Sequence, residues 1–203
     1  MISLAANFIF IHRGKSAGNT ITDTLLPHAT DNTKSSAKPH QDGINRFGIH
    51  NTSLQIRKHA SIGEYKELLD APVFESLYKF SVIRNPFDRL VSAYFHPGRV
   101  MRQGGAFDEP TFIRIIQTQR TLREFTYLNT NDKLDTHLNR LIRYEHLAKD
   151  LEAVMEDLSL PFTSPKHLNR STREHYQSYY TPATRSLVED LFAEELDLGQ
   201  YTY

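Results

Sequence analysis

The sequence predicts an α/β protein with three layers, in which helices cover both faces of a central parallel sheet. Short apolar segments that suit buried strands lie at 7–11, 77–83 and 138–144. Between them lie segments whose apolar residues recur three and four positions apart, as in amphipathic helices. Because strands that alternate with helices generally pair in parallel, this pattern predicts a sheet flanked by helices on both sides.

The helices are predicted from this periodicity and from the residues that begin them. They are expected at 20–26, 61–69, 110–119, 147–158 and 181–196. Ser61 and Glu64 match the S-x-x-E capping box, in which two side chains satisfy free backbone N–H groups at a helix start. Thr181 and Pro182 suit the start of the last helix, because threonine can cap it and proline lacks an N–H that would go unbonded.

Length and charge favour one domain with no general attraction to polyanions. At 203 residues, with no internal repeat and no linker, the chain is expected to form a single domain spanning 1–203. Its 24 Lys and Arg residues balance 24 Asp and Glu residues. Neither nucleic acid nor a membrane is therefore expected as a partner, and any anion site must be local.

Cysteine content and the N-terminal segment bear on the compartment. The chain has no cysteine, which excludes disulfides and thiolate metal sites. The apolar segment near the N-terminus is too short to span a bilayer and lacks a basic leader and a small-residue cleavage site. A cytoplasmic location is therefore expected. The polar stretch 27–51 is typical of a mobile loop.

The most informative segment follows the first strand, where His12-Arg13-Gly14-Lys15-Ser16-Ala17-Gly18-Asn19-Thr20 leads into a helix. Gly14 and Gly18 can take φ above zero and let backbone N–H groups close around an anion, and the helix N-terminus adds its dipole. Lys15 adds a full positive charge. The alternative is an ordinary strand-to-helix turn with an exposed lysine.

The same segment matches only part of the Walker loop, G-x-x-x-x-G-K-[ST]. Gly14, Lys15 and Ser16 match its last three positions, but Ile9 stands where its first glycine should be. The wide loop that wraps a triphosphate therefore has no room to form. A shorter loop with a lysine near its start suits a smaller 5′-phosphate group.

A second group of residues follows the strand at 77–83. Arg84 stands at the carboxyl end of this strand, where open α/β sheets bind ligands, and Pro86 suits the first turn of a helix. Ser92 lies about two helical turns further on, so a guanidinium and a hydroxyl can converge on one phosphate. In the alternative interpretation, Arg84 and Arg89 are surface partners of Asp88. The nearby glycine-rich loop favours the phosphate site.

These segments resemble a known family, the sulfotransferases related to the Golgi carbohydrate and heparan sulfate enzymes. Residues 10–20 are similar to its 5′-phosphosulfate loop, F-I-H-I-P-K-T-A-G-T-S, and residues 84–94 to its 3′-phosphate motif, R-x-P-x-x-R-x-x-S-x-Y. Residues 167–173, followed by three tyrosines, are similar to its H-L-N-x-S segment. Gly14 replaces the family's usual proline, and Asn19 replaces a threonine or serine.

The resemblance implies a fold, a reaction and a set of site residues. The fold is the three-layer, P-loop nucleotide-hydrolase-like sulfotransferase fold. The reaction is transfer of a sulfuryl group from 3′-phosphoadenosine 5′-phosphosulfate (PAPS) to an acceptor hydroxyl, on a carbohydrate or a small alcohol, with no metal. The residues expected to bind the cofactor are Arg13, Gly14, Lys15, Ser16, Ala17, Gly18, Asn19, Thr20, Arg84, Ser92, Ser171 and Thr172. Lys15 is also expected to stabilise charge on the leaving oxygen.

A hydroxyl acceptor has to lose a proton, and a positioned base contributes roughly 10²- to 10⁴-fold in rate. His59 is the favoured base because it directly precedes a capped helix and because members of the family carry a similar histidine between the two cofactor motifs. The alternative is a surface histidine that flanks a helix. His12 is the second candidate, and its alternative is a partly buried histidine bonded to backbone. No histidine stands in a metal-binding pattern.

Two other functions and several structural details stay open from the sequence. A small-molecule or nucleotide kinase would need a Mg²⁺-binding carboxylate at the end of an apolar strand. A non-catalytic nucleotide- or glycan-binding module would keep the fold without the base. Tyr176, Tyr179 and Tyr180 suit either a nucleotide or acceptor pocket or the core. The acceptor, which depends on loops such as 27–51 and 98–109, and the oligomeric state are also open.

Overall fold

The sheet carries the elements that position the candidate site. The computed structural model describes residues 1–28, 56, 58–96, 107–129, 131, 133, 137–165 and 173–203. Within these residues the strands lie in the order β1 (Ile2–Ser3), β2 (Phe8–Ile11), β3 (Tyr78–Ile83) and β4 (Arg140–Arg143). β2, β3 and β4 run parallel to one another, whereas β1 is antiparallel to β2.

The three strands predicted from the sequence are confirmed, with ends that differ by one to two residues. The central parallel sheet is confirmed, and β1 adds an antiparallel strand at its edge, because the chain turns back on itself between β1 and β2. Asn7 in that turn has a φ of 56°, the left-handed region that asparagine tolerates better than most residues. A strand of two residues leaves no alternating pattern in the sequence, so β1 could not be predicted.

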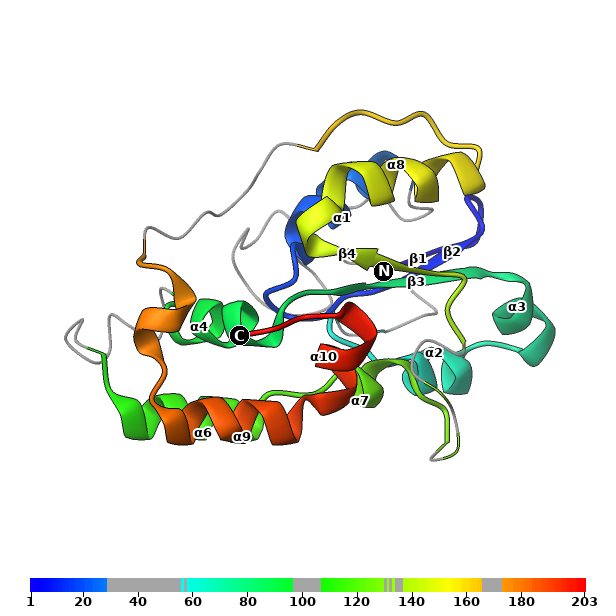
Figure 1. Ribbon diagram of the computed structural model, residues 1–203. Helices are drawn as coiled ribbons and strands as arrows, with labels where there is room; N and C mark the ends of the chain where they lie inside the picture. The colour runs from blue at the N-terminus through cyan, green and yellow to red at the C-terminus, as the bar shows by residue number, and fades with distance from the viewer. Residues whose placement is uncertain are drawn as a thin grey trace, which may run out of the picture.

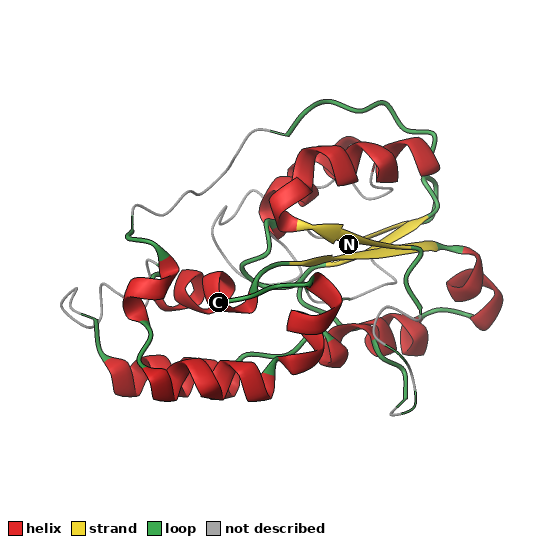
Figure 2. Ribbon diagram, in the orientation of Figure 1, coloured by secondary structure: helices red, strands yellow, loops and turns green. Residues whose placement is uncertain are grey.

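Helices cover both faces of the sheet, which confirms the three-layer prediction (Figures 1 and 2). One face is covered by α1 (Gly18–Leu25) and α8 (Leu147–Asp157). On the opposite side lie α2 (Ile62–Leu68), α7 (Arg123–Thr126) and α10 (Ala193–Gly199). All four residues of β2 are buried, as expected for a parallel strand with helices on both sides.

A second group of helices packs beside the sheet, around its own buried core (Figure 1). It contains α4 (Pro86–Tyr94), α6 (Glu109–Thr118) and α9 (Pro182–Leu191). The core between them is rich in aromatic rings, with Phe87 and Phe112 both in edge-to-face contact with Tyr180. α4 directly follows β3 in the chain, so this group of helices adjoins the sheet at the carboxyl end of β3.

The remaining elements are short. They are α3 (Ala71–Ser76) and the 3₁₀ turns η1 (Leu26–His28), η3 (Tyr144–His146) and η4 (Tyr176–Tyr179). α3 and α7 were not predicted, since six and four residues show too little periodicity. Of the predicted loop 27–51, Pro27 and His28 close η1, and the rest lies outside the described residues. Phe107 and the residues that begin α6 are the described part of 98–109.

Two helix starts confirm their predicted caps, whereas the end of the last helix corrects the prediction. Ser61 and Glu64 form the capping box of α2, and the Thr181 side chain accepts a hydrogen bond from the backbone N–H of Thr184 at the start of α9. The predicted single helix to about Leu196 is instead two helices. Phe192 interrupts it with φ −118° and ψ 22°, while its ring is buried in the second core.

Among the helices described, none has both the length and the hydropathy that crossing a bilayer requires.

Candidate active site

The two predicted anion-binding motifs leave the sheet at the same edge. β2 and β3 are parallel neighbours, with Ile11 opposite Ser81, and the Ser81 hydroxyl donates a hydrogen bond of 3.0 Å to the Ile11 carbonyl. The loop after β2 and the residues after β3 therefore start side by side. This is the carboxyl edge of the parallel strands, where open α/β sheets bind ligands.

The loop from His12 to Ala17 joins β2 to α1 through a backbone that curls tightly. Lys15 has a φ of 65° and Ala17 a φ of 54°, both in the left-handed region. Ala17 is the N-cap residue of α1, and no side chain caps this end. No side chain therefore accepts hydrogen bonds from the first N–H groups of α1. These groups lie at the positive end of the helix dipole, where they can donate to other backbone atoms, to water or to an anion.

The glycines of this loop do not have the conformation expected from the sequence. Neither Gly14 nor Gly18 lies in the left-handed region, and the left-handed residues of the loop are Lys15 and Ala17. Gly18 is needed for space instead: a Cβ there would lie 1.9 Å from Nε2 of His12. The prediction of a tight loop stands, but its left-handed turns fall on side-chain-bearing residues, which costs about 1–3 kcal/mol each.

Replacing Gly18 with alanine is expected to destabilise the protein by roughly 1–3 kcal/mol, because the buried His12 ring cannot move aside freely. A chain of this size should then lose about 2–4 °C in Tm for each kcal/mol. Gly14→Ala is the matched control, since a Cβ at Gly14 meets nothing within 4 Å. Thermal unfolding of both variants checks this. An equal loss of Tm in both would contradict the role assigned to Gly18.

Arg84 connects the two motifs directly. Its Nη1 donates a hydrogen bond of 2.6 Å to the carbonyl oxygen of Lys15, in the loop after β2. Its Nε and Nη2 donate to the Asp88 carboxylate one turn along the chain, with Nε at 2.9 Å. The guanidinium also lies 3.9 Å from the ring centroid of Tyr144. Only 7% of Arg84 is exposed, so its position is fixed by these contacts.

Asp88 also holds a second arginine, Arg173, which sequence reasoning did not single out. Arg173 Nη2 donates a hydrogen bond to Oδ1 of Asp88, whose other oxygen faces Arg84. Burial acts to raise the pKa of Asp88, but the two guanidiniums outweigh it and the net pKa is lowered. Arg173 is the last residue of the third predicted motif. Its position directly after Ser171 and Thr172 was the sequence signal that could have marked it as a site residue. Those two residues lie outside the described part of the chain.

Ser92 lies on α4 four residues after Asp88. Residues four apart share one face of a helix, so Ser92 lies one turn above the carboxylate that holds the two arginines. Its side chain is half-buried. Ser92 therefore follows Arg84 and Asp88 along the chain, on the helix that leaves the carboxyl end of β3.

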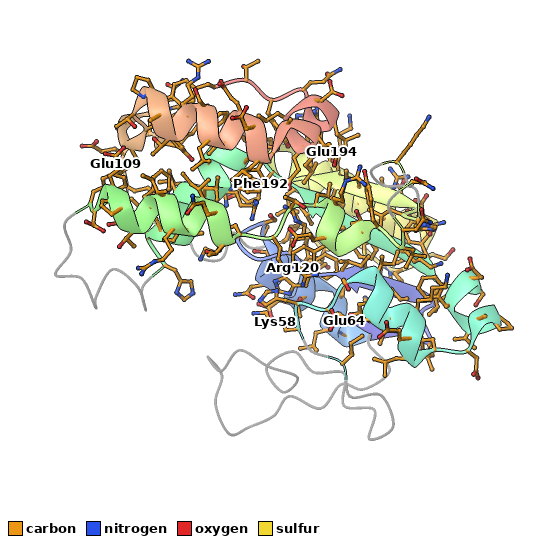
Figure 3. All side chains as sticks on the ribbon, turned by 90° about the horizontal axis from the view of Figure 1, so that it is seen from below. Lys58, Glu64, Glu109, Arg120, Phe192 and Glu194 are labelled. Carbon is orange, nitrogen blue, oxygen red and sulfur yellow. The ribbon has the colours of Figure 1, made fainter. Side chains whose placement is uncertain are left out.

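His59 lies against the loop after β2. Its Nδ1 is 2.8 Å from the carbonyl oxygen of His12, and the two imidazole rings meet edge to face at 4.8 Å. A carbonyl only accepts, so Nδ1 carries the proton and Nε2 carries the lone pair of the neutral ring. Arg120 Nη1 donates to the His59 carbonyl at 3.4 Å, and Figure 3 shows Arg120 near Lys58. The favoured base and the second candidate are therefore neighbours, and His12 is the buried one.

Arg13 points away from this edge, into the interior. Its Nη2 donates to both carboxylate oxygens of Glu195, and the side chains are 0% and 2% exposed. Its guanidinium is also 5.9 Å from the Phe125 ring centroid. Arg13 was expected to bind the cofactor, but its side chain is buried in the core. Only its backbone is therefore available to a ligand at the loop.

The tyrosines left open by the sequence pack in the second core. Tyr180 donates to the Phe87 carbonyl at 2.9 Å, and its pKa is raised, mainly by burial. Tyr176 stacks on the Phe87 ring at 6.3 Å, and Tyr179 meets Phe95 at 4.9 Å. The three rings are thus partly buried and pack against the second core along α4.

Within the described residues, no three His, Cys, Asp or Glu side chains gather as they would around a metal ion.

Comparison with known proteins gives a family match over nearly the whole chain. The model of the sulfotransferase family matches residues 2–202. The crystal structure of a sulfotransferase from Alicyclobacillus acidocaldarius is similar at 16% sequence identity, with 97% of this chain and 96% of that chain covered and a TM-score of 0.41. No curated protein sequence matches the chain.

Proposed function

The chain belongs to the sulfotransferase family, and from this we propose that it is an enzyme that moves a sulfuryl group from PAPS to an acceptor hydroxyl, on a carbohydrate or a small alcohol. The observation that carries the proposal is the hydrogen bond of 2.6 Å from Arg84 to the Lys15 carbonyl. It joins the two anion-binding motifs at one edge of the sheet. A nucleotide with a phosphate at each end of its ribose needs two such sites next to each other.

The donor groups at this edge fit such an anion. Lys15, Arg84 and Arg173 bring three positive charges to this edge, where Asp88 pairs with both arginines. Glu145 is a second carboxylate there, and it accepts a hydrogen bond of 3.2 Å from the Asn85 N–H. The N-terminus of α1 has no side-chain cap, and the buried hydroxyl of Ser16 in the same loop finds no hydrogen-bond partner among the described residues. A phosphate or sulfate group accepts hydrogen bonds and carries the opposite charge.

We assign the 5′ end of the nucleotide to the loop and the 3′-phosphate to the start of α4. Lys15 and the N–H groups from Ser16 to Thr20 would hold the 5′-phosphosulfate, together with the backbone of Arg13, Gly14, Ala17, Gly18 and Asn19. Arg84 and Ser92 would hold the 3′-phosphate, with Arg173 beside them and Ser171 and Thr172 following from the resemblance. When bound, the donor supplies an activated sulfuryl group, whose sulfur bonds to the acceptor oxygen while its bond to the 5′-phosphate oxygen breaks.

His59 is the proposed general base. The bond from Nδ1 to the His12 carbonyl fixes the ring and leaves Nε2 as its basic atom. Nε2 takes the proton of the acceptor hydroxyl as the oxygen attacks. Lys15 and the amide N–H groups stabilise the negative charge that grows on the leaving oxygen. No carboxylate ends β3, where a kinase of the kind weighed above would need one, since Arg84 stands there.

Calorimetry with adenosine 3′,5′-bisphosphate, the expected product, tests the proposal. The protein should bind this compound and should not bind ATP measurably, with or without Mg²⁺. Preference for ATP with Mg²⁺ would favour a kinase and overturn the proposal. Binding without any sulfate transfer to a panel of sugar and alcohol acceptors would favour the non-catalytic module.

A further inference from the structure

A buried ion pair links the anion-binding loop to a helix near the end of the chain. Arg13, directly before Gly14 and Lys15, donates from Nη2 to Oε1 and Oε2 of Glu195 at 2.9 and 3.0 Å. The two residues are 182 positions apart in sequence. Arg13 lies two residues after the end of β2 and two before Lys15, so holding its side chain in place restrains the backbone where the loop begins.

Glu195 holds a third segment as well. Its Oε1 accepts a hydrogen bond of 2.5 Å from the backbone N–H of Leu122, at the start of α7. One carboxylate therefore joins the loop to α10 and α7, which lie on the side of the sheet opposite α1 (Figure 1). A residue bonded to two other elements is well placed to fix the loop relative to the rest of the molecule.

The charges around Glu195 make it difficult to replace. Arg89 on α4 is also buried, with its guanidinium 5.3 Å from the Phe192 ring centroid. Burial and the charge of Arg13 lower the pKa of Arg89 to about 10, while the charge of Glu195 opposes that shift. Glu195 thus neutralises one of two interior guanidiniums that lie within electrostatic reach of each other. Removing one partner of a buried pair leaves a charge uncompensated.

We propose that Glu195 is a positioning residue for the anion-binding loop and acts on it through Arg13. The loop holds two left-handed residues that bear side chains, Lys15 and Ala17, and such strain persists only where the surroundings fix it. The inference rests on the proposed function only in taking this loop as the site of the donor's 5′ end.

The test compares Glu195→Gln with Glu194→Gln. Glu194 is the next residue on α10, is half exposed and pairs with the exposed Arg123 (Figure 3 labels Glu194). Hydrogen exchange by mass spectrometry should show peptides covering 12–20 exchanging roughly tenfold faster in Glu195→Gln, with peptides covering β3 unchanged. The dissociation constant for adenosine 3′,5′-bisphosphate should rise by about tenfold, since the loop must be ordered again on binding. Glu194→Gln should match wild type in both measurements.

The inference would be overturned if folded Glu195→Gln exchanged hydrogen at 12–20 at the wild-type rate. It would also be overturned if exchange became faster to the same extent throughout the sheet. If that variant does not fold, Arg13→Lys takes its place, because it keeps every charge and removes Nη2, the atom that donates to both oxygens of Glu195. The same faster exchange at 12–20 is expected there, and wild-type exchange in it overturns the inference. The exchange measurement needs no ligand, so a wild-type protein that fails to bind the nucleotide would refute the proposed function and leave this result standing.

Discussion

Replacing His59 with asparagine is expected to lower kcat by roughly 10²- to 10⁴-fold, the contribution of a positioned general base. Asparagine keeps a donor where Nδ1 stands, so the hydrogen bond to the His12 carbonyl can persist. It removes Nε2, the atom assigned to take the acceptor's proton. The affinity for adenosine 3′,5′-bisphosphate should therefore stay within about twofold of wild type, because His59 holds no phosphate in this scheme. Sulfate-transfer kinetics and calorimetry measure the two quantities separately.

His146→Asn is the matched control, since it makes the same change at an exposed histidine before α8. It should leave both kcat and affinity unchanged. A His59→Asn protein with near wild-type kcat would remove His59 from the reaction. Loss of nucleotide affinity in step with kcat would show instead that His59 shapes the loop and does not act as the base.

Replacing Lys15 with asparagine is expected to lower kcat/KM by about 10²- to 10³-fold, the effect of removing one charge-stabilising donor at a developing oxyanion. The ammonium is assigned both to binding the 5′ end and to the leaving oxygen. Asparagine suits the test because Lys15 has a φ of 65°, which asparagine tolerates better than most residues. The change therefore removes the charge without adding backbone strain. Steady-state kinetics should show both a lower kcat and a higher KM.

Lys149→Asn, at an exposed position on α8, controls for the loss of one positive charge from the protein. Its kinetics should equal those of wild type. If Lys15→Asn raised KM alone and left kcat intact, the lysine would bind the donor without helping the leaving oxygen. An unchanged kcat/KM would place the 5′ end away from this loop.

The elements that could be predicted are those whose signals are local. All of β2 and nearly all of β3 are buried, so both could be recognised as short, mostly apolar segments. β4 gives a weaker signal, because only Ile142 of its four residues is buried. The α2 start could be predicted because a capping box lies within four residues. The break at Phe192 could not, because the burial of one ring in a core built by α4, α6 and α9 decides it.

The site residues likewise fall into those with a local sequence signal and those that depend on long-range contacts. Lys15, Arg84 and Ser92 could be found from their places at strand ends and on one helix, and His59 from its place before a capped helix together with the family resemblance. The pairs Arg13–Glu195 and Asp88–Arg173 depend on contacts across 182 and 85 positions, which no local pattern reveals. The left-handed conformation of Lys15 and Ala17 could not be read from the sequence, and neither could the need of Gly18 for space, which comes from the His12 ring.

Calorimetry on wild type and Ser92→Ala, with adenosine 3′,5′-bisphosphate and adenosine 5′-phosphate, tests most directly whether the two motifs hold opposite ends of one nucleotide. Ser92 lies on α4, away from the loop backbone that Arg84 contacts. Because Ser92→Ala loses a hydrogen bond to a charged group, it should bind adenosine 3′,5′-bisphosphate roughly tenfold or more weakly than wild type does. Binding of the 5′-phosphate should not change. Equal weakening of both compounds, or no weakening of the bisphosphate, would contradict the account.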